Sequence, residues 1–466
     1  MGNERLEQHF KQLILNTKYS YEEGRQSAIE LLTATVQKLP IPLVEEYSQL
    51  FFLPLVLQLS NDDSKVCREA IAISIGVLLK RLSMQVLHAL YAYCSKWMND
   101  HRLRRAATQV LGLFVDSRPD FFQKGSIGGE VVATLRDALV KDEQEGMPSW
   151  EKCYLSLQTL EKMNSKLPSA VQRDMELWQG ILKCLIHSHP WIQEVSSRLI
   201  SSHLQSLNPR NLETLRLQNE SDELCDMPFI IKLSGALFEI ARNICFQIST
   251  KDENLSDDVI RLAVKNLTWV IVAMHFSPRL CFKADDKRKD LDTLKIQGNC
   301  GGYDGVCVDG DVVLEEYEEI DEYSQRKQIR DPVNWLISRL SGMTKGSRCN
   351  PKCREVVFKC FGSFAITCEP VIFSPPVVEK IIEALLSSPD AEEGELAKEV
   401  LQILENKLDS TIYLTAYTSV QSRLRVKRQE RKDKRRVEAV VDPQSAAKRK
   451  IEKQQREKSR KKLRYK

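Results

Sequence analysis

Apolar residues recur along this chain with the period of an α-helix, and the alternation typical of strands is almost absent. The segment over residues 66–79 carries two adjoining apolar stripes, made of Val66, Ala70, Ile73 and Val77 and of Ile71, Ile75 and Leu78. A surface helix of a globular protein needs a single stripe. The two stripes therefore predict a helix with neighbours on more than one side, as in a stack of helices.

A second helix is predicted just before this one, in EYSQLFFLPLVLQLS, with Pro54 at a position where proline bends a helix. The turn between the two helices is NDDS, residues 61–64, which supplies turn and N-cap chemistry. A helix with an internal proline, an Asp-containing turn and then Val-x-Arg-x-Ala together resemble the HEAT repeat.

The apolar pattern recurs at intervals near 40 residues. The first stripe reappears 37 residues later, at Leu103, Ala107, Val110 and Phe114. A further copy, HPWIQEVSSRLISSHL, keeps the 4, 3, 4 spacing at Ile192, Ser196, Leu199 and His203. A period of this length built from two helices is the signature of HEAT or armadillo stacking. We therefore expect an all-α fold, a HEAT/armadillo-like α-solenoid of degenerate helix pairs with a basic helical C-terminal tail.

The periodicity divides the chain into four regions. We expect a HEAT-like array over residues 1–282, an acidic, glycine-containing disordered insertion over 283–330, the last HEAT-like repeats over 331–420, and a basic tail over 421–466. The composition of the insertion fits a solubilising loop, although its glutamates could also bind cations or a basic partner.

Charge separates these regions. The whole chain has a net charge of +4, but residues 421–466 carry 20 Lys and Arg against 6 Asp and Glu. Residues 304–322 contain nine acidic side chains and no basic one. Such asymmetry points to a polyanion as the partner of the basic end.

The tail is predicted to form two basic helices, over roughly 409–440 and 444–462, separated at Pro443. It could be a solvated helix end, a nuclear localisation signal or an RNA-binding segment, and the last two are compatible. Aromatic residues are scarce there, so we expect contacts with phosphates and no base stacking. The candidate RNA-binding residues are Arg423, Arg425, Lys427, Arg428, Arg431, Lys432, Lys434, Arg435, Arg436, Lys448, Arg449 and Lys450.

Other chemistry has little support in the sequence. No nucleophile elbow, zinc-protease motif or phosphate-binding loop occurs, so we expect no enzyme, catalytic residue, cofactor or small-molecule substrate. The cysteines at 349, 353, 360 and 368 are spaced too loosely for a typical zinc site, and burial on a helix explains them. The longest apolar runs, residues 50–59 and 267–276, are shorter than the ~20 residues that span a bilayer, so no membrane partner is expected.

Four stretches together resemble a known family: YEEGR at 21–25, LFFLPLVLQLSNDDSKVCREA, HPWIQEVSSRLI, and the tail VQSRLRVKRQERKDKRR followed by EAVVDPQSAAKRK. They are similar to the C-terminal region of the DRIM ("down-regulated in metastasis") family, a very large HEAT-repeat component of the small-subunit processome. The resemblance covers nearly all of the chain except the acidic insertion. It implies a nucleolar, non-enzymatic scaffold that is needed for pre-rRNA cleavage and has other pre-ribosomal assembly proteins as partners.

Residues and resemblance together predict a scaffold of small-subunit ribosome biogenesis in the nucleolus, with its basic tail on the phosphate backbone of pre-ribosomal RNA. The alternative is a HEAT-repeat adaptor for protein cargo, of the transport or phosphatase-scaffold type, whose tail is only a nuclear localisation signal. The scaffold hypothesis predicts that RNase treatment disrupts the complexes that the chain forms, whereas the adaptor hypothesis predicts that they stay intact.

Overall fold

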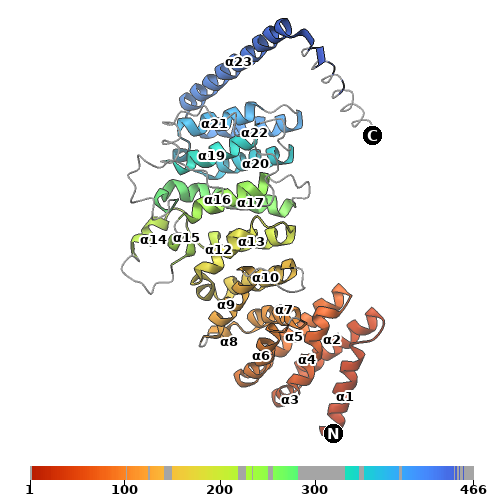
Figure 1. Ribbon diagram of the computed structural model, residues 1–466. Helices are drawn as coiled ribbons and strands as arrows, with labels where there is room; N and C mark the ends of the chain where they lie inside the picture. Colours follow the sequence, from red (N-terminus) through yellow and green to blue (C-terminus); the bar gives the residue numbers. More distant parts are fainter. Residues whose placement is uncertain are drawn as a thin grey trace. The chain divides into compact units, whose positions relative to one another are not determined.

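A computed structural model shows the architecture (Figure 1). It describes residues 3–444 except 101, 124–125, 141–148, 219–226, 234, 250–255, 282–330, 346–350 and 388–390, and also residues 447, 448, 451 and 455. The described residues form helices and turns and no strand. They group into two compact units, Met1–Pro332 (unit 1) and Val333–Lys466 (unit 2). The expected all-α fold is confirmed.

Unit 1 is a succession of short and medium helices, stacked in chain order (Figure 1). They are α1 (Asn3–Asn16), α2 (Glu22–Lys38), α3 (Ile41–Glu46), α4 (Ser48–Asn61), α5 (Lys65–Arg81), α6 (Met84–Met98), α7 (Arg104–Ser117), α8 (Pro119–Gln123), α9 (Ile127–Val140), α10 (Ser149–Lys166), α11 (Pro168–Gln172), α12 (Met175–Cys184), α13 (Pro190–Gln205), α14 (Leu212–Gln218), α15 (Phe229–Lys232), α16 (Ala236–Ser249), α17 (Asp257–Phe276) and the 3₁₀ turn η1 (Pro278–Cys281).

The helices of unit 1 pack in two rows. In the first row α2, α5, α7, α10, α13 and α17 each contact the next, and in the second row α9, α12 and α16 do so. The rows are joined by pairs such as α4 with α5, α9 with α10 and α16 with α17. Each repeat therefore buries its apolar faces against its neighbours, which is the arrangement of a HEAT-like solenoid.

Side-chain caps set where several first-row helices begin. Ser64 accepts a hydrogen bond from the backbone N–H of Cys67 at 3.2 Å, and Ser256 accepts one from Val259 at 3.3 Å. Such a cap satisfies one of the free N–H groups at a helix start and contributes about 1 kcal/mol. The predicted turn before α5 thus has the N-cap role expected of it.

α5 has neighbours on more than one side, as the sequence predicts, but only one of the two predicted apolar stripes is buried. α5 contacts α2, α4 and α7, and Ile71, Ile75 and Leu78 are fully buried. In the other stripe, however, Val66 is 46% and Ile73 63% exposed. Cys67 and Ser74 are buried instead, and they complete the packed face of α5 together with Ile71, Ile75 and Leu78. The hydropathy pattern did not single out these two small residues.

This shift also corrects the repeat register. The buried residues of α5 and α7 correspond at an interval of 36 residues, one fewer than the apolar pattern predicts. The matching pairs are Ile71 with Ala107, Ser74 with Val110, Ile75 with Leu111, Leu78 with Phe114 and Leu79 with Val115. The expected stripe on α13, at Ile192, Ser196, Leu199 and His203, is fully buried and is confirmed.

Arginines at the ends of first-row helices join successive repeats. Arg81 donates to the carbonyl oxygens of Val36 at 2.5 Å and Leu39 at 2.7 Å, and Arg118 donates to that of Leu82 at 2.6 Å. The last carbonyls of a helix have no partner within it, and a cation there also complements the helix dipole. Each of these arginines therefore caps the helix of the preceding repeat.

One described helix, α17, is long and apolar enough to cross a membrane by length and composition alone. The uninterrupted apolar run found in the sequence covers only part of α17, because Lys265, Asn266 and Thr268 are polar. Most of its apolar stretch is buried, and α17 contacts α13, α16 and η1. These contacts make it a core helix of unit 1.

Unit 2 contains α19 (Pro332–Met343), α20 (Pro351–Thr367), η3 (Pro370–Ile372), α21 (Pro375–Leu386), α22 (Ala391–Lys407) and α23 (Ser410–Val441). α20 packs on α22, and α21 packs on α22 and α23. Lys380 of α21 ties α19 to this group through Asn334 at 2.8 Å and Ser338 at 2.5 Å. The expected insertion over 283–330 and most of the second basic helix over 444–462 lie outside the described residues.

Candidate nucleic-acid interface

α23 carries most of the predicted RNA-binding residues, and it is the longest helix that the structure describes, with 32 residues. It begins after Asp409, whose carboxylate accepts a hydrogen bond from the backbone N–H of Thr411 at 2.8 Å. Hydrogen bonds from the side chain and backbone of Thr411 hold the pKa of Asp409 below its usual value. The predicted helix over roughly 409–440 is therefore present, with a side-chain cap at its start.

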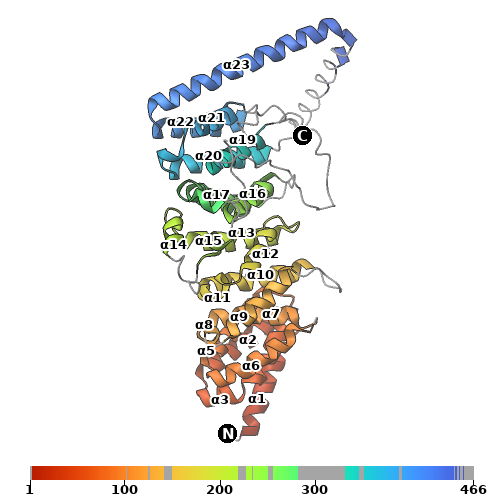
Figure 2. The ribbon, with the colours of Figure 1, turned by 60° about the vertical axis from the view of Figure 1, so that its left-hand side comes forward.

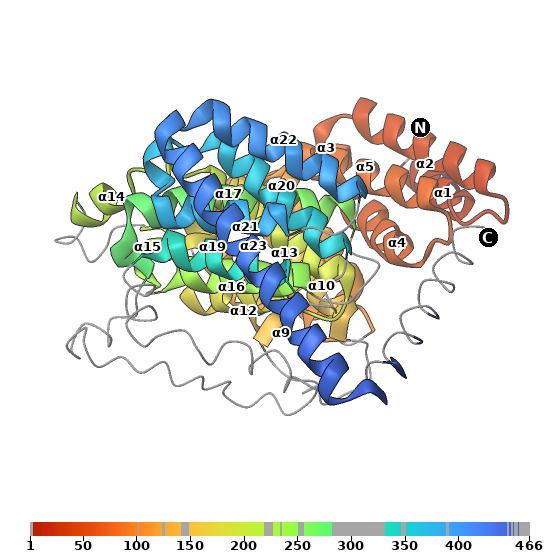
Figure 3. The same cartoon turned by 90° about the horizontal axis from the view of Figure 1, so that it is seen from above.

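The first third of α23 is anchored on unit 2. Tyr413, Ala416 and Val420 lie at spacings of 3 and 4, so they share one face, and each is at most 5% exposed. α21 is the main neighbour of α23. Seen from above (Figure 3), α23 crosses α21 obliquely and runs on past it. This apolar face holds the base of the helix in place.

Two ion pairs continue the anchor for one more turn. Arg423 lies 2.9 Å from a carboxylate oxygen of Glu379, and Lys427 lies 3.4 Å from one of Glu383. Glu383 is also 3.3 Å from Lys345. Burial raises the pKa of Glu383, but Lys345, Lys427 and Arg423 outweigh it and hold the pKa below its usual value. Two of the predicted RNA-binding cations thus contact carboxylates of their own unit.

The C-terminal part of α23 extends past the rest of unit 2 (Figure 2). All described side chains from Arg425 to Val441 are exposed. Arg436 pairs with Asp433 at 3.4 Å, one turn away. Six candidate cations have no carboxylate within ion-pair distance among the described residues: Arg425, Arg428, Arg431, Lys432, Lys434 and Arg435. Lys448 is exposed as well, whereas Arg449 and Lys450 lie outside the described residues.

The anchored face of α23 changes chemistry along its length. The positions that follow Val420 on this face at spacings of 4, 3 and 4 are Leu424, Lys427 and Arg431. The side of the helix that is apolar at its base is therefore basic once it passes the end of α21. Of these two cations, Lys427 pairs with Glu383, whereas Arg431 has no carboxylate within ion-pair distance among the described residues and is available to an external anion.

The half-buried carboxylate partners on α21 were missed by reasoning from sequence. Glu379 and Glu383 are one helical turn apart on α21, as Arg423 and Lys427 are on α23. Matched pairs of opposite charge at i and i+4 are the signal that could have suggested a salt-bridged contact between the two helices. Without knowledge of which helices pack together, that signal is too common to be used.

The cysteines of the loose zinc candidate are spread over the core of unit 2. Cys353, Cys360 and Cys368 are all at most 6% exposed, and burial raises the pKa of Cys368 to about 12. Cys349 lies outside the described residues. Within the described part of the chain, no three His, Cys, Asp or Glu side chains are grouped in a way that could hold a metal ion. The three described cysteines act as small apolar core residues.

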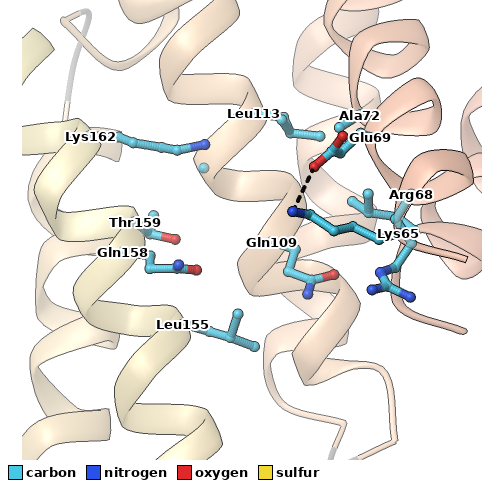
Figure 4. Close-up of a pocket in the computed structure, with 12 residues that line it drawn as sticks. Lys65, Arg68, Glu69, Ala72, Gln109, Leu113, Leu155, Gln158, Thr159 and Lys162 are labelled. Atoms are coloured by element: carbon cyan, nitrogen blue, oxygen red, sulfur yellow. Dashed lines mark ion pairs between the residues drawn. The ribbon is translucent and has the colours of Figure 1, made fainter. Parts of the chain in front are cut away.

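A hollow of about 240 Å³ lies on the surface of unit 1 among α4, α5, α7 and α10 (Figure 4). Its charged side chains have partners nearby: Lys65 pairs with Glu69 at 3.7 Å, Lys162 with Asp116 at 2.7 Å, and Arg68 donates to the carbonyl of Asp62 at 2.6 Å. Neutral amides and leucines line the rest. Lys162 with Asp116 joins α10 to α7, whereas the other two interactions stay within one repeat, and the three interactions account for these charges as structural contacts.

Comparison with known proteins bears on this interface. Residues 327–466, which include α23, match the family model described as "Small subunit processome component 20 homolog, C-terminal". The whole chain is similar to "U3 small nucleolar RNA-associated protein 20" of Saccharomyces cerevisiae, at 23% identity over 98% of this chain, and to that of Schizosaccharomyces pombe, at 24% over 96%. The chain spans only 17% and 16% of the length of these relatives.

Among solved structures, a crystal structure of importin beta matches with a TM-score of 0.48 and 13% identity, covering 87% of this chain and 46% of that one. Yeast importin-beta (Kap95p) matches with a TM-score of 0.46 and 11% identity, covering 87% and 46%. The fold assignment rests on the helix rows described above and does not depend on these scores. The assignment to the DRIM family in particular stays a prediction. The chain is thus similar over nearly its whole length to U3 small nucleolar RNA-associated protein 20 of two yeasts, and residues 327–466, which carry α23, match the C-terminal family model of small subunit processome component 20.

Proposed function

We propose that this chain is part of a non-enzymatic scaffold of small-subunit ribosome biogenesis, and that α23 binds the phosphate backbone of pre-ribosomal RNA. The observation that carries the proposal is a set of six exposed cations that have no ion-pair partner among the described residues, on a helix whose base is packed against unit 2. Lys and Arg in such a setting neutralise phosphates and release counterions. The names of the relatives, which refer to U3 small nucleolar RNA and to the processome, support the same partner.

The helix rows of unit 1 support the scaffolding part of the proposal. A stack of helix pairs exposes long surfaces along its sides and buries little beyond its own repeats, which suits docking of other pre-ribosomal assembly proteins. We infer a nucleolar location from the same relatives, and support of pre-rRNA processing as the role within the processome. On this proposal the chain needs no cofactor and acts on no small-molecule substrate.

A charge-removal variant tests the proposal without disturbing the fold. The six unpaired cations of α23 are changed to Gln, and they are exposed, so the anchor at Tyr413, Ala416 and Val420 is kept. The matched control changes six exposed cations of unit 1 to Gln: Lys18, Lys38, Lys80, Lys183, Lys232 and Arg242. Both variants lose the same net charge. This design is sharper than a chain ending at residue 420, which would also remove the ion pairs of Arg423 and Lys427.

The measurement is co-sedimentation with pre-ribosomal particles in nuclear extract, with and without RNase. We expect the wild type and the unit 1 control to co-sediment in an RNase-sensitive manner, and the α23 variant to be lost from the particles and from the nucleolus. If the α23 variant co-sediments like the wild type, and RNase leaves the complexes intact, the adaptor alternative replaces this proposal.

A further inference from the structure

The cations of α23 are distributed around the helix in a way that says more about the RNA. Successive residues of an α-helix are turned by about 100°, so the basic positions from Arg423 to Arg436 cover about 220° of the circumference. The remaining arc carries Val426, Gln429, Glu430, Asp433 and Val437. The helix therefore has a broad basic side and a narrower outer arc that is acidic and apolar.

A flat array of phosphates cannot satisfy this distribution. Lys434 lies roughly 160° around the helix from Lys432 and roughly 180° from Arg425. A surface that touches one of these groups leaves the other in solvent on the opposite side of a cylinder about 10–12 Å across. Both groups can reach phosphates only where phosphates line two sides of the helix, as they do in the groove of a nucleic acid duplex.

The width of the groove restricts which class of nucleic acid α23 can bind. The major groove of regular A-form RNA is deep and too narrow to be read by side chains, so it does not admit a helix with its arginines and lysines. A bulge or internal loop interrupts the duplex and lets this groove open. Single strands are poorly suited, because α23 has no aromatic side chain after Tyr417 on which bases could stack.

We propose that residues 425–436 of α23 lie in the major groove of double-helical RNA where a bulge or internal loop widens it. The proposal rests on the proposed function and specifies its ligand. Arg423 and Lys427, paired with Glu379 and Glu383, position the helix at the mouth of the groove. Glu430 and Asp433 face outward, away from the phosphates that would repel them.

The first test compares ligands. Binding of the full chain is measured by fluorescence anisotropy with four nucleic acids of equal phosphate number: a regular RNA hairpin, the same stem with a three-nucleotide bulge, a single-stranded RNA and a B-form DNA duplex. We expect the bulged RNA to bind about tenfold more tightly than the regular hairpin or the single strand. The DNA duplex should also bind well, because its major groove, about 12 Å wide, admits an α-helix.

The second test compares the two sides of the helix. One variant combines Arg425→Gln with Lys432→Gln, and the other combines Arg431→Gln with Lys434→Gln. A groove predicts that each pair weakens binding of the bulged RNA to a similar degree. The control, Val426→Gln with Val437→Gln, alters the outer arc and should leave affinity unchanged.

The outcomes separate this inference from the proposed function. If the regular hairpin or the single strand binds as tightly as the bulged RNA, or if only one of the two pairs matters, α23 binds on a surface and the groove proposal is overturned while RNA binding stands. If the wild type binds none of the four ligands, both proposals fail.

Discussion

His203 shows how a single residue can depart from the chemistry of its repeat position. It is 1% exposed and packs beside the stacked rings of Trp178 and Phe229, with ring centroids 4.6 Å and 4.8 Å from its own. Neither of its nitrogens has a hydrogen-bond partner in the described structure. Burial lowers its pKa to about 4. Leu78 and Phe114 occupy the same position in other repeats, so the site is built for an apolar side chain.

We predict that this histidine makes unit 1 sensitive to mild acid. The pKa is depressed in the folded state, from about 6.5 in the unfolded chain, so the unfolded state binds more protons as pH falls from 6.5 to 4. The free energy of unfolding should fall by about 2 kcal/mol between pH 7 and pH 5. Urea unfolding followed by tryptophan fluorescence measures it. His203→Leu should abolish this pH dependence, and an unchanged dependence would show that other groups cause it.

Glu383 on α21 pairs with Lys427 at the base of α23 and with Lys345. We predict that Glu383→Gln loosens the base of α23, because Lys345 and Lys427 lose their shared partner, at a cost of about 1 kcal/mol. The pKa of Glu383 is lowered in the folded state, so its contribution is present above the unfolded pKa and is lost as pH falls through the folded pKa. Hydrogen exchange of the amides over residues 410–424 measures the effect, and Glu395→Gln, at an exposed position on α22, is the control. Equal protection in both variants would contradict it.

At the scale of elements, most helices could be predicted from periodicity, but their packing partners could not. The helix from Lys65 to Arg81 and the long helix from Ser410 to Val441 both follow from pattern and caps. The one-residue register shift between α5 and α7 was missed because Cys67 and Ser74 are buried by contact with neighbours, which hydropathy does not encode. The same limit hid the pairing of α21 with α23, and with it the roles of Glu379 and Glu383.

The arginine caps are a second element-scale feature that sequence does not reveal. We predict that Arg81→Ala destabilises unit 1 by about 1–3 kcal/mol, because carbonyls at the end of α2 lose a charged donor. The neighbouring Lys80→Ala removes an exposed cation on the same turn and should cost little. Urea denaturation of both variants measures the difference. Equal midpoints would show that water replaces the arginine without penalty.

At the scale of the whole molecule, the separation of charge along the chain is evident from the sequence. Whether carboxylates of the same chain neutralise the basic residues depends on the structure. The tail's excess of Lys and Arg could equally have been neutralised by the body of the chain. The structure pairs only Arg423 and Lys427 with carboxylates of α21, and it leaves six cations of α23 unpaired among the described residues. The acidic run at 304–322 lies outside those residues, and its role stays a prediction.

The central claim is that these six cations bind RNA phosphates, and the salt dependence of RNA binding tests it most directly. Affinity for a bulged RNA hairpin is measured over a range of salt concentrations for the wild type, the six-cation α23 variant and the six-cation unit 1 control. The claim predicts that the slope of log affinity against log salt falls in magnitude by roughly 4 to 5 in the α23 variant and hardly at all in the control. Equal slopes for all three proteins would contradict it.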